Sequence, residues 1–144
     1  ANYIKLYMQR FPELAEYMDK TKKFAKEHGY VLTQLGRPVY MRGILSKNGD
    51  ERAFDERQEI KATIQGTAAD IMKLGMIAVD RVLREKKLPA RLLLQVHDEL
   101  VLEVADDAAE DTAAQVKAAM EGVLTIGVPL VAEAGIGLNW DTAH

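Results

Sequence analysis

Residues 92–104 of the sequence read LLLQVHDELVLEV, two apolar runs on either side of a short polar pair. Runs rich in leucine and valine that are separated by two polar residues are typical of a tight β-hairpin. The polar pair, His97 and Asp98, would form the turn, and Glu99 would open the second strand. This stretch therefore predicts an antiparallel hairpin that carries a histidine and two adjacent carboxylates at its tip.

The two carboxylates, Asp98 and Glu99, repel each other at such a turn and favour a nearby counter-charge. Mg²⁺ is one candidate, because it prefers oxygen ligands and is usually held by one or two carboxylates together with substrate phosphates. Neighbouring strand residues point to opposite faces, but this rule relaxes at a hairpin tip, so both side chains could approach one ion. An acidic pair in a turn is more often simply solvated, and the pair by itself leaves both interpretations open.

Upstream of the hairpin, residues 50–87 have apolar positions at helical spacing, which predicts one long helix. Its centre, residues 66–69, consists of small side chains, which allow another segment to approach closely or allow tight packing between helices. We expect Gly66 to be the point where this helix bends or is interrupted.

A polar stripe runs along the same helix, because Arg57, Lys61 and Gln65 follow one another at four-residue steps. Arginine and lysine suit phosphate oxygens, and a glutamine amide can donate to or accept from base edges. Glu56 and Glu59 offer a simpler explanation, since they could pair with the basic residues as ordinary surface salt bridges.

The other patterns along the chain predict shorter elements on both sides of the long helix. Pro12 suits a first helical turn, Gly29 a helix end and Gly36 a hairpin turn. The expected elements are helices over residues 3–10, 12–28 and 108–121, strands over 30–33, 38–41, 92–96 and 99–104, and a last strand over 130–134. The fold class is therefore α+β: a small antiparallel sheet, made of the 91–104 hairpin and the last strand, packs on the long helix and the 108–121 helix.

Length and composition exclude several classes of protein. The 144 residues suffice for one domain or one lobe of a larger one, and the absence of cysteine excludes a disulfide scaffold or a thiolate metal site. No apolar run approaches the roughly 20 residues of a membrane span, and the start of the sequence lacks the apolar core of a signal peptide, so a cytoplasmic location fits. The chain starts at Ala1 in a pattern that looks like the middle of a helix, so we expect an excised fragment.

The formal net charge of −3 is unevenly distributed along the sequence. Residues 1–97 carry 18 basic and 12 acidic side chains, a balance of +6, whereas residues 98–144 carry 1 basic and 10 acidic side chains, a balance of −9. The first part could meet a polyanion more easily than the second, although an unevenly charged solvated surface accounts for the same numbers.

Taken together, these motifs are far more specific than any one of them. QGTAAD at residues 65–70, followed by QVHDELVLE at 95–103, resembles the family A DNA polymerases, the group of bacterial DNA polymerase I. HDE with its apolar flanks looks like the third polymerase motif of this family. The resemblance covers essentially the whole chain in the right order, through FPELAEYM at 11–18, GYVLTQLGRPVYM at 29–41, ERQEIKATIQGTAADIMK at 56–73 and VPLVAEAGIGLNWD at 128–141.

The resemblance implies a domain assignment and a set of catalytic residues. Residues 1–49 would be part of the fingers subdomain, and residues 50–144 the C-terminal part of the palm. Asp98 matches the metal-binding aspartate of the third motif, and Glu99 matches the neighbouring carboxylate, which supports the metal site and is generally less critical. His97 matches a residue that lies near the primer terminus.

The resemblance also gives the polar stripe a role in binding DNA. Arg57 and Gln65 match residues that contact the minor groove and backbone of the primer–template, and Lys61 lies between them on the same stripe. The sequence departs from the family at three places: Lys61 stands where an asparagine is usual, Glu59 where a small or apolar residue is usual, and Pro38 where a basic residue is common.

The activity implied by the resemblance is DNA-directed DNA synthesis, in replication or repair, by a nucleotidyltransferase with two Mg²⁺ ions. It would transfer deoxynucleotides from deoxynucleoside triphosphates to a primer 3′ end and release pyrophosphate. The family's first motif, with the other metal-binding aspartate, and its nucleotide-binding fingers helix are not found in these 144 residues. We therefore expect the fragment alone to be inactive and to need the N-terminal remainder of the polymerase as a partner. The alternative is a non-catalytic DNA-binding or structural module in which HDE survives as a turn.

Overall fold

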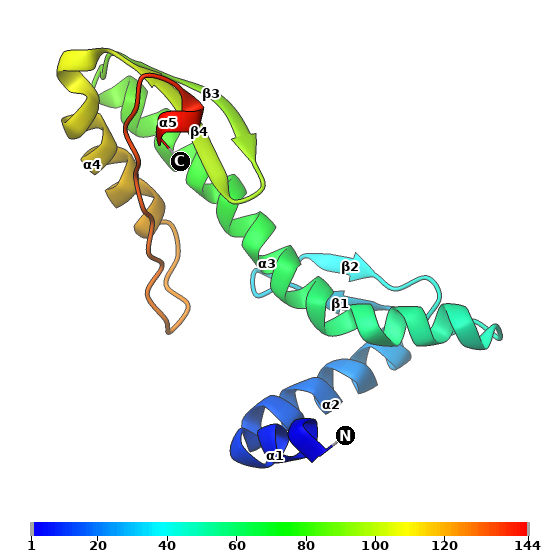
Figure 1. The fold of residues 1–144 in the computed structure, drawn as a ribbon. Helices are drawn as coiled ribbons and strands as arrows, with labels where there is room; N and C mark the ends of the chain where they lie inside the picture. The colour runs from blue at the N-terminus through cyan, green and yellow to red at the C-terminus, as the bar shows by residue number, and fades with distance from the viewer. Residues whose placement is uncertain (1, 144) are drawn as a thin grey trace. The chain divides into compact units, whose positions relative to one another are not determined.

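The computed structural model describes residues 2–143, apart from the side chains of residues 2, 4, 5, 53, 56 and 57. It forms two compact units, Ala1–Thr67 and Ala68–His144. The long helix α3 (Gly49–Glu85) contributes to both, and it continues through Gly66 without the interruption that the glycine suggested. Figure 1 shows the order of the elements, and the α+β class predicted from the sequence is confirmed.

The first unit is built from two helices, a short hairpin and the N-terminal part of α3. Pro12 occupies the first turn of its helix as predicted, and Gly29 ends that helix with a φ of 75°, where its N–H donates to Ala25 O. Tyr30 pairs with Tyr40 in the antiparallel hairpin that follows. The elements before α3 are α1 (Asn2–Arg10), α2 (Pro12–His28), β1 (Tyr30–Leu32) and β2 (Pro38–Tyr40).

A small apolar core holds the first unit together. Ala25 of α2, Val31 of β1 and Ile44 of the following loop are almost completely buried, and Ala62 of α3 packs against them. This core places the hairpin on the part of α3 that carries the predicted polar stripe.

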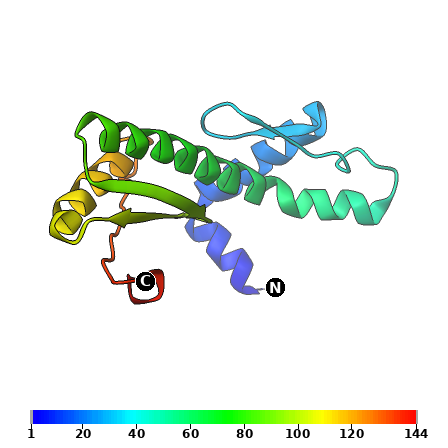
Figure 2. The same ribbon diagram turned by 90° about the horizontal axis from the view of Figure 1, so that it is seen from above.

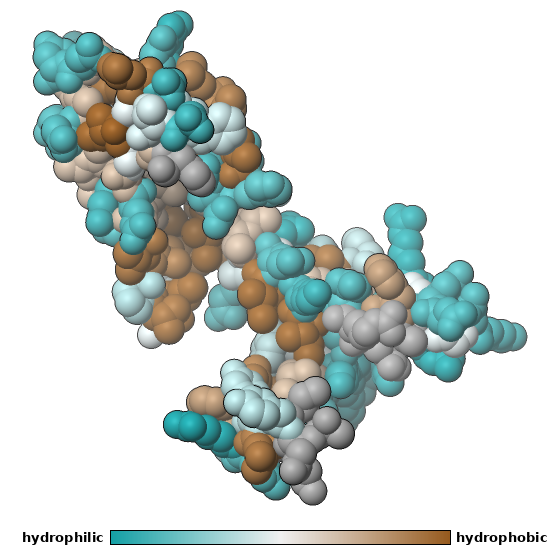
Figure 3. All heavy atoms as spheres, in the orientation of Figure 1, coloured by the Kyte–Doolittle hydropathy of each residue, from teal (hydrophilic) through white to brown (hydrophobic). Residues whose placement is uncertain are grey.

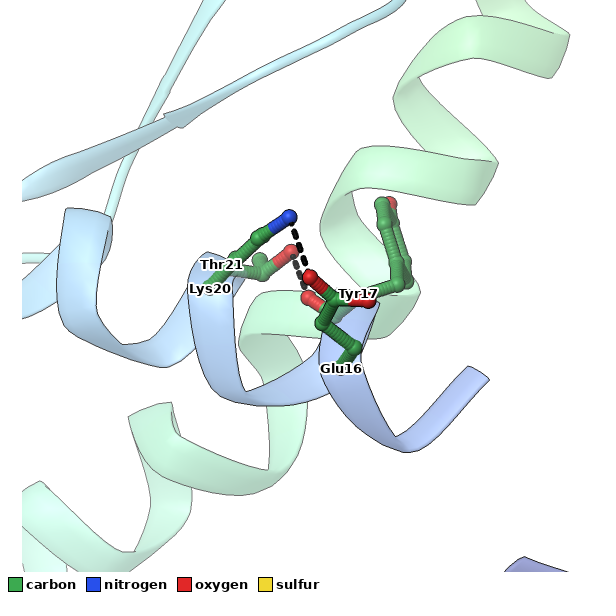
Figure 4. Close-up of polar contacts among 4 residues, drawn as sticks. All are labelled: Glu16, Tyr17, Lys20 and Thr21. Carbon is green, nitrogen blue, oxygen red and sulfur yellow. Dashed lines mark hydrogen bonds and ion pairs between the residues drawn. The ribbon is translucent and has the colours of Figure 1, made fainter. Parts of the chain in front are cut away.

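The surface of α2 is held by local contacts between residues four positions apart (Figure 4). Lys20 Nζ lies 2.6 Å from Glu16 Oε1, and Thr21 Oγ1 donates to the carbonyl of Tyr17 over 2.8 Å. The hydrogen bond from Lys20, together with its positive charge, lowers the pKa of Glu16 below its ordinary value. The pair is exposed, so it contributes little to stability.

The second unit packs a two-stranded hairpin and a helix against the C-terminal half of α3, as Figure 2 shows from above. Val79 and Leu83 of α3 and Val116 form its buried core, with Leu92 and Leu102 of the hairpin packed against it. The ladder contains an irregularity between residues 92 and 94. The remaining elements are β3 (Ala90–Val96), β4 (Glu99–Val104), the 3₁₀ turn η1 (Asp106–Ala108), α4 (Ala109–Glu121) and α5 (Trp140–Ala143).

The last strand predicted from the sequence, over residues 130–134, is wrong. The described residues there form no strand, and the N–H of Ala132 donates over 3.0 Å to the Glu121 carboxylate rather than to a neighbouring backbone. An apolar stretch becomes a strand only when another strand pairs with it, and β3 pairs only with β4 among the described strands. The second unit therefore has a two-stranded sheet, without the third strand that the sequence suggested.

Apolar side chains also reach the surface of the second unit, where they appear brown in Figure 3. Leu93 and Leu94 on β3 and Val131 and Leu138 in the C-terminal segment are all exposed. Across the part of the chain that the structure describes, no helix combines the length and the apolar character needed to cross a bilayer.

Candidate active site

The site begins at the turn of the β3–β4 hairpin. Val96 pairs with Glu99, so His97 and Asp98 alone make the connection, as the sequence predicted. His97 has a φ of 52°, in the left-handed region that is unfavourable for a residue with a side chain. The side-chain amide of Gln95 donates to the carbonyl of His97 and so supports the turn from the preceding strand.

The turn brings the three predicted residues together and leaves two of them open to solvent. His97 and Asp98 are exposed, and Glu99 is half-buried. The oxygen donors of Asp98 and Glu99 fit the chemistry of Mg²⁺. Among the described side chains, however, no group of three or more histidine, aspartate or glutamate residues is placed to hold a metal. The turn therefore presents two adjacent carboxylates, which no other described side chain extends to a set of three.

The predicted stripe on α3 lies in the first unit. Lys61 and Gln65 are both exposed, so their side chains are available to a ligand, whereas the side chain of Arg57 lies outside the described residues. Glu59, one of the acidic residues considered as a partner for the stripe, is 0% exposed.

The β1–β2 hairpin is fixed on α3 directly beside Gln65, which the sequence did not predict in detail. Arg37 Nη2 donates to Gly66 O over 3.0 Å, and the N–H of Gln34 donates to Thr67 Oγ1 over 2.9 Å. A Cβ on Gly66 would lie 2.8 Å from Thr33 Cγ2, too close for a real contact. The small residues at 66–69 were the sequence signal for this contact. Of the two uses suggested for them, Gly66 serves the close approach of another segment.

Comparisons with known proteins identify the class of protein to which this fold and these motifs belong, the DNA polymerases. The family model described as DNA polymerase family A matches residues 1–142, so the chain belongs to DNA polymerase family A. This confirms the resemblance drawn from the sequence.

Individual relatives agree with this assignment. DNA polymerase I of Pseudomonas aeruginosa is 51% identical over 142 residues, which are 99% of this chain and 16% of that protein. DNA polymerase I of Caldicellulosiruptor bescii is 44% identical over 140 residues, 97% of this chain and again 16% of the relative. The chain therefore spans about one sixth of the length of these curated relatives.

A solved structure is also similar. It is the POL domain of Pol1 from M. smegmatis in complex with a DNA primer-template and dNTP. The TM-score is 0.91 at 37% sequence identity, and the match covers 97% of this chain and 25% of that one.

Proposed function

We propose that this chain supplies the carboxylate-bearing hairpin and part of the primer–template groove of a DNA-directed DNA polymerase, which adds deoxynucleotides to a primer 3′ end. The observation that carries the proposal is the β3–β4 turn, with His97 and Asp98 exposed and Glu99 beside them, in a chain that belongs to family A. Residues 1–49 would be part of the fingers and residues 50–144 part of the palm. Work on cellular DNA, in replication or repair, would place the polymerase in the cytoplasm.

Asp98 and Glu99 are the residues that would hold Mg²⁺ in this proposal. When bound in a complete polymerase, the two ions supply positive charge that offsets the negative charge at the primer hydroxyl and the triphosphate. Asp98, exposed at the turn, would be the direct ligand. Glu99 is half-buried at the start of β4 and would support the site with its negative charge. The left-handed backbone of His97 sets the path of the chain through the turn, and its imidazole would lie beside the primer terminus.

The exposed side chains on α3 would hold the DNA. A lysine such as Lys61 interacts with phosphate oxygens as a point charge and so contributes affinity without reading sequence. Gln65 can donate its amide to the minor-groove acceptors, purine N3 and pyrimidine O2, which every correct base pair presents. Arg57 would extend the same contact line along the primer–template backbone.

The experiment that tests the proposal grafts this chain into a relative. In the chimera, the matching 142 residues of the Pseudomonas aeruginosa DNA polymerase I are replaced by this chain. We expect the chimera to extend a primer in a template-directed way, and the 144-residue chain alone to bind primer–template weakly and extend nothing. A chimera that folds and binds DNA but extends no primer would favour the non-catalytic module, and extension by the chain alone would overturn the expected incompleteness.

Substitution of Lys61 should change the salt dependence of DNA binding by the chimera. If Lys61 neutralises one phosphate, Lys61→Ala lowers the slope of log affinity against log salt by about one. The measurement is fluorescence anisotropy of labelled primer–template over a range of salt concentrations. Lys73→Ala, another exposed lysine on α3, is the matched control and should leave the slope unchanged. Equal slopes for the Lys61 variant and the parent chimera would remove Lys61 from the interface.

Replacement of His97 by glycine should raise the stability of the chain and lower the activity of the chimera. His97→Gly relieves about 1–2 kcal/mol of left-handed backbone strain, which exceeds the roughly 0.5–1 kcal/mol entropic cost of glycine. We expect a small gain in stability against urea together with slower primer extension by the chimera. Lys87→Gly is the matched control, because Lys87 has the same φ of 52° at the end of α3. It should gain stability and retain full activity, and equal loss of activity in both variants would argue against a role for the imidazole.

A further inference from the structure

The β1–β2 hairpin loop, residues 33–37, fastens onto one turn of α3, residues 63–67. Hydrogen bonds join them, including one from Arg37 Nη2 to Gly66 O over 3.0 Å and one from the N–H of Gln34 to Thr67 Oγ1 over 2.9 Å. Thr67 Oγ1 in turn donates to Thr63 O over 2.8 Å. The loop therefore bonds to the two residues that directly follow Gln65, and Thr67 is bonded in turn to the helix one turn earlier.

The loop is itself rigid where it meets the helix. The N–H of Arg37 donates to Thr33 Oγ1 over 3.1 Å, and the N–H of Thr33 donates to Arg37 O over 2.9 Å. Thr33 is only 4% exposed, and its methyl carbon lies 2.8 Å from the position that a Cβ of residue 66 would take. Only glycine at this position allows the loop to lie so close to α3.

Gly66 also weakens α3 at the point where the loop contacts it. A glycine inside a helix is less favourable than alanine by roughly 1 kcal/mol, because its backbone loses more freedom on folding. Gly66 directly follows Gln65, whose exposed amide must meet an acceptor in the minor groove with an accuracy of a fraction of an ångström. Hydrogen bonds from a rigid loop to residues 66 and 67 restrict the backbone at the place where the glycine loosens it.

We propose that Arg37 and Thr67 are positioning residues, which fix the turn of α3 so that Gln65 meets the minor groove at the primer terminus in the correct register. The inference rests on the proposed function, because it needs Gln65 to read the primer–template. Neither residue touches DNA in this scheme; each acts on the backbone next to Gln65.

The test compares two primer–templates in the chimera. One has a natural purine at the primer-terminal pair, and the other has a 3-deazapurine, which presents a carbon instead of the N3 acceptor. Gln65→Ala should lower kcat/KM about tenfold on the natural substrate and hardly at all on the 3-deaza substrate. Arg37→Met and Thr67→Val should repeat this pattern, and combining either with Gln65→Ala should add no further loss.

Controls separate positioning from a general effect on structure. Arg37→Lys and Thr67→Ser keep a donor or a hydroxyl in place and should restore most of the lost kcat/KM. Arg42→Met removes an exposed arginine from the following loop and should leave both substrates unaffected. If the Arg37 variant proves too unstable, the comparison of Thr67→Val with Thr67→Ser decides alone.

Two outcomes overturn different claims. If Arg37→Met and Thr67→Val slow extension equally on both substrates, they act through general stability and the positioning role is wrong. If Gln65→Ala itself slows extension equally on both substrates, the proposed reading of the minor groove fails, and the positioning role fails with it. The response of the Gln65 variant therefore shows which of the two claims is at fault.

Discussion

Asp98→Ala is expected to lower templated primer extension by the chimera by about a thousandfold, the scale on which loss of one essential electrostatic group slows catalysis. Asp98 is exposed at the tip of the β3–β4 hairpin. Its removal takes away the one direct metal ligand that we assign to this chain. Glu99→Ala, by contrast, should slow extension by about tenfold, because we assign Glu99 a supporting role through its charge. The measurement is single-turnover nucleotide incorporation at saturating primer–template.

The control for this prediction is Asp107→Ala, which removes an exposed carboxylate from η1 of the same unit without touching the turn. It should leave incorporation unchanged. Primer–template affinity of the Asp98 variant, measured without metal, should not fall, because the carboxylate that is removed repels DNA phosphates. An Asp98 variant that retains a tenth or more of the parent rate would exclude this carboxylate as the essential ligand.

Gly66→Ala should destabilise the chain by up to about 2 kcal/mol. The new methyl group would lie 2.8 Å from Thr33 Cγ2 and 3.3 Å from Val39 Cγ2, both on side chains of the docked hairpin. Overpacking of this kind costs roughly 1–3 kcal/mol, and the better helix propensity of alanine returns only about 1 kcal/mol of it. The change is measured as the free energy of unfolding in urea.

Gly75→Ala provides a comparison within the same helix. Its Cβ would lie 3.9 Å from the side chain of Met120, an ordinary van der Waals contact. Only the gain in helix propensity then remains, so Gly75→Ala should stabilise the chain by up to about 1 kcal/mol. Opposite signs for the two variants are the expected result. Stabilisation by both would mean that the hairpin does not hold its close position on α3.

Local sequence signals predicted most of the secondary structure. Pro12 and Gly29 indicated where α2 begins and ends, and the polar pair after Val96 indicated the turn between β3 and β4. The last strand could not be judged in this way, because residues 130–134 have strand-like composition but no strand partner among the described residues. Strand formation depends on a neighbouring strand, which is a property of the tertiary structure rather than of the segment.

The sequence predicted the hairpin that carries the candidate site, but it did not predict the packing around the polar stripe on α3. The three residues of the turn are adjacent in sequence, so their meeting in space followed from the hairpin alone. The burial of Glu59 was not predictable, since a charged residue on a helix is normally assigned to the surface. The contact of Arg37 with Gly66 joins positions 29 residues apart and needs the packed hairpin to be seen.

The central claim is that this chain supplies working palm residues to a family A polymerase, and single-turnover incorporation by the unsubstituted chimera tests it most directly. We expect the correct nucleotide to be incorporated within about tenfold of the rate of the Pseudomonas aeruginosa enzyme, and to be preferred over a mismatched one by about a hundredfold or more. A folded chimera that binds primer–template with normal affinity but incorporates neither nucleotide would contradict the account.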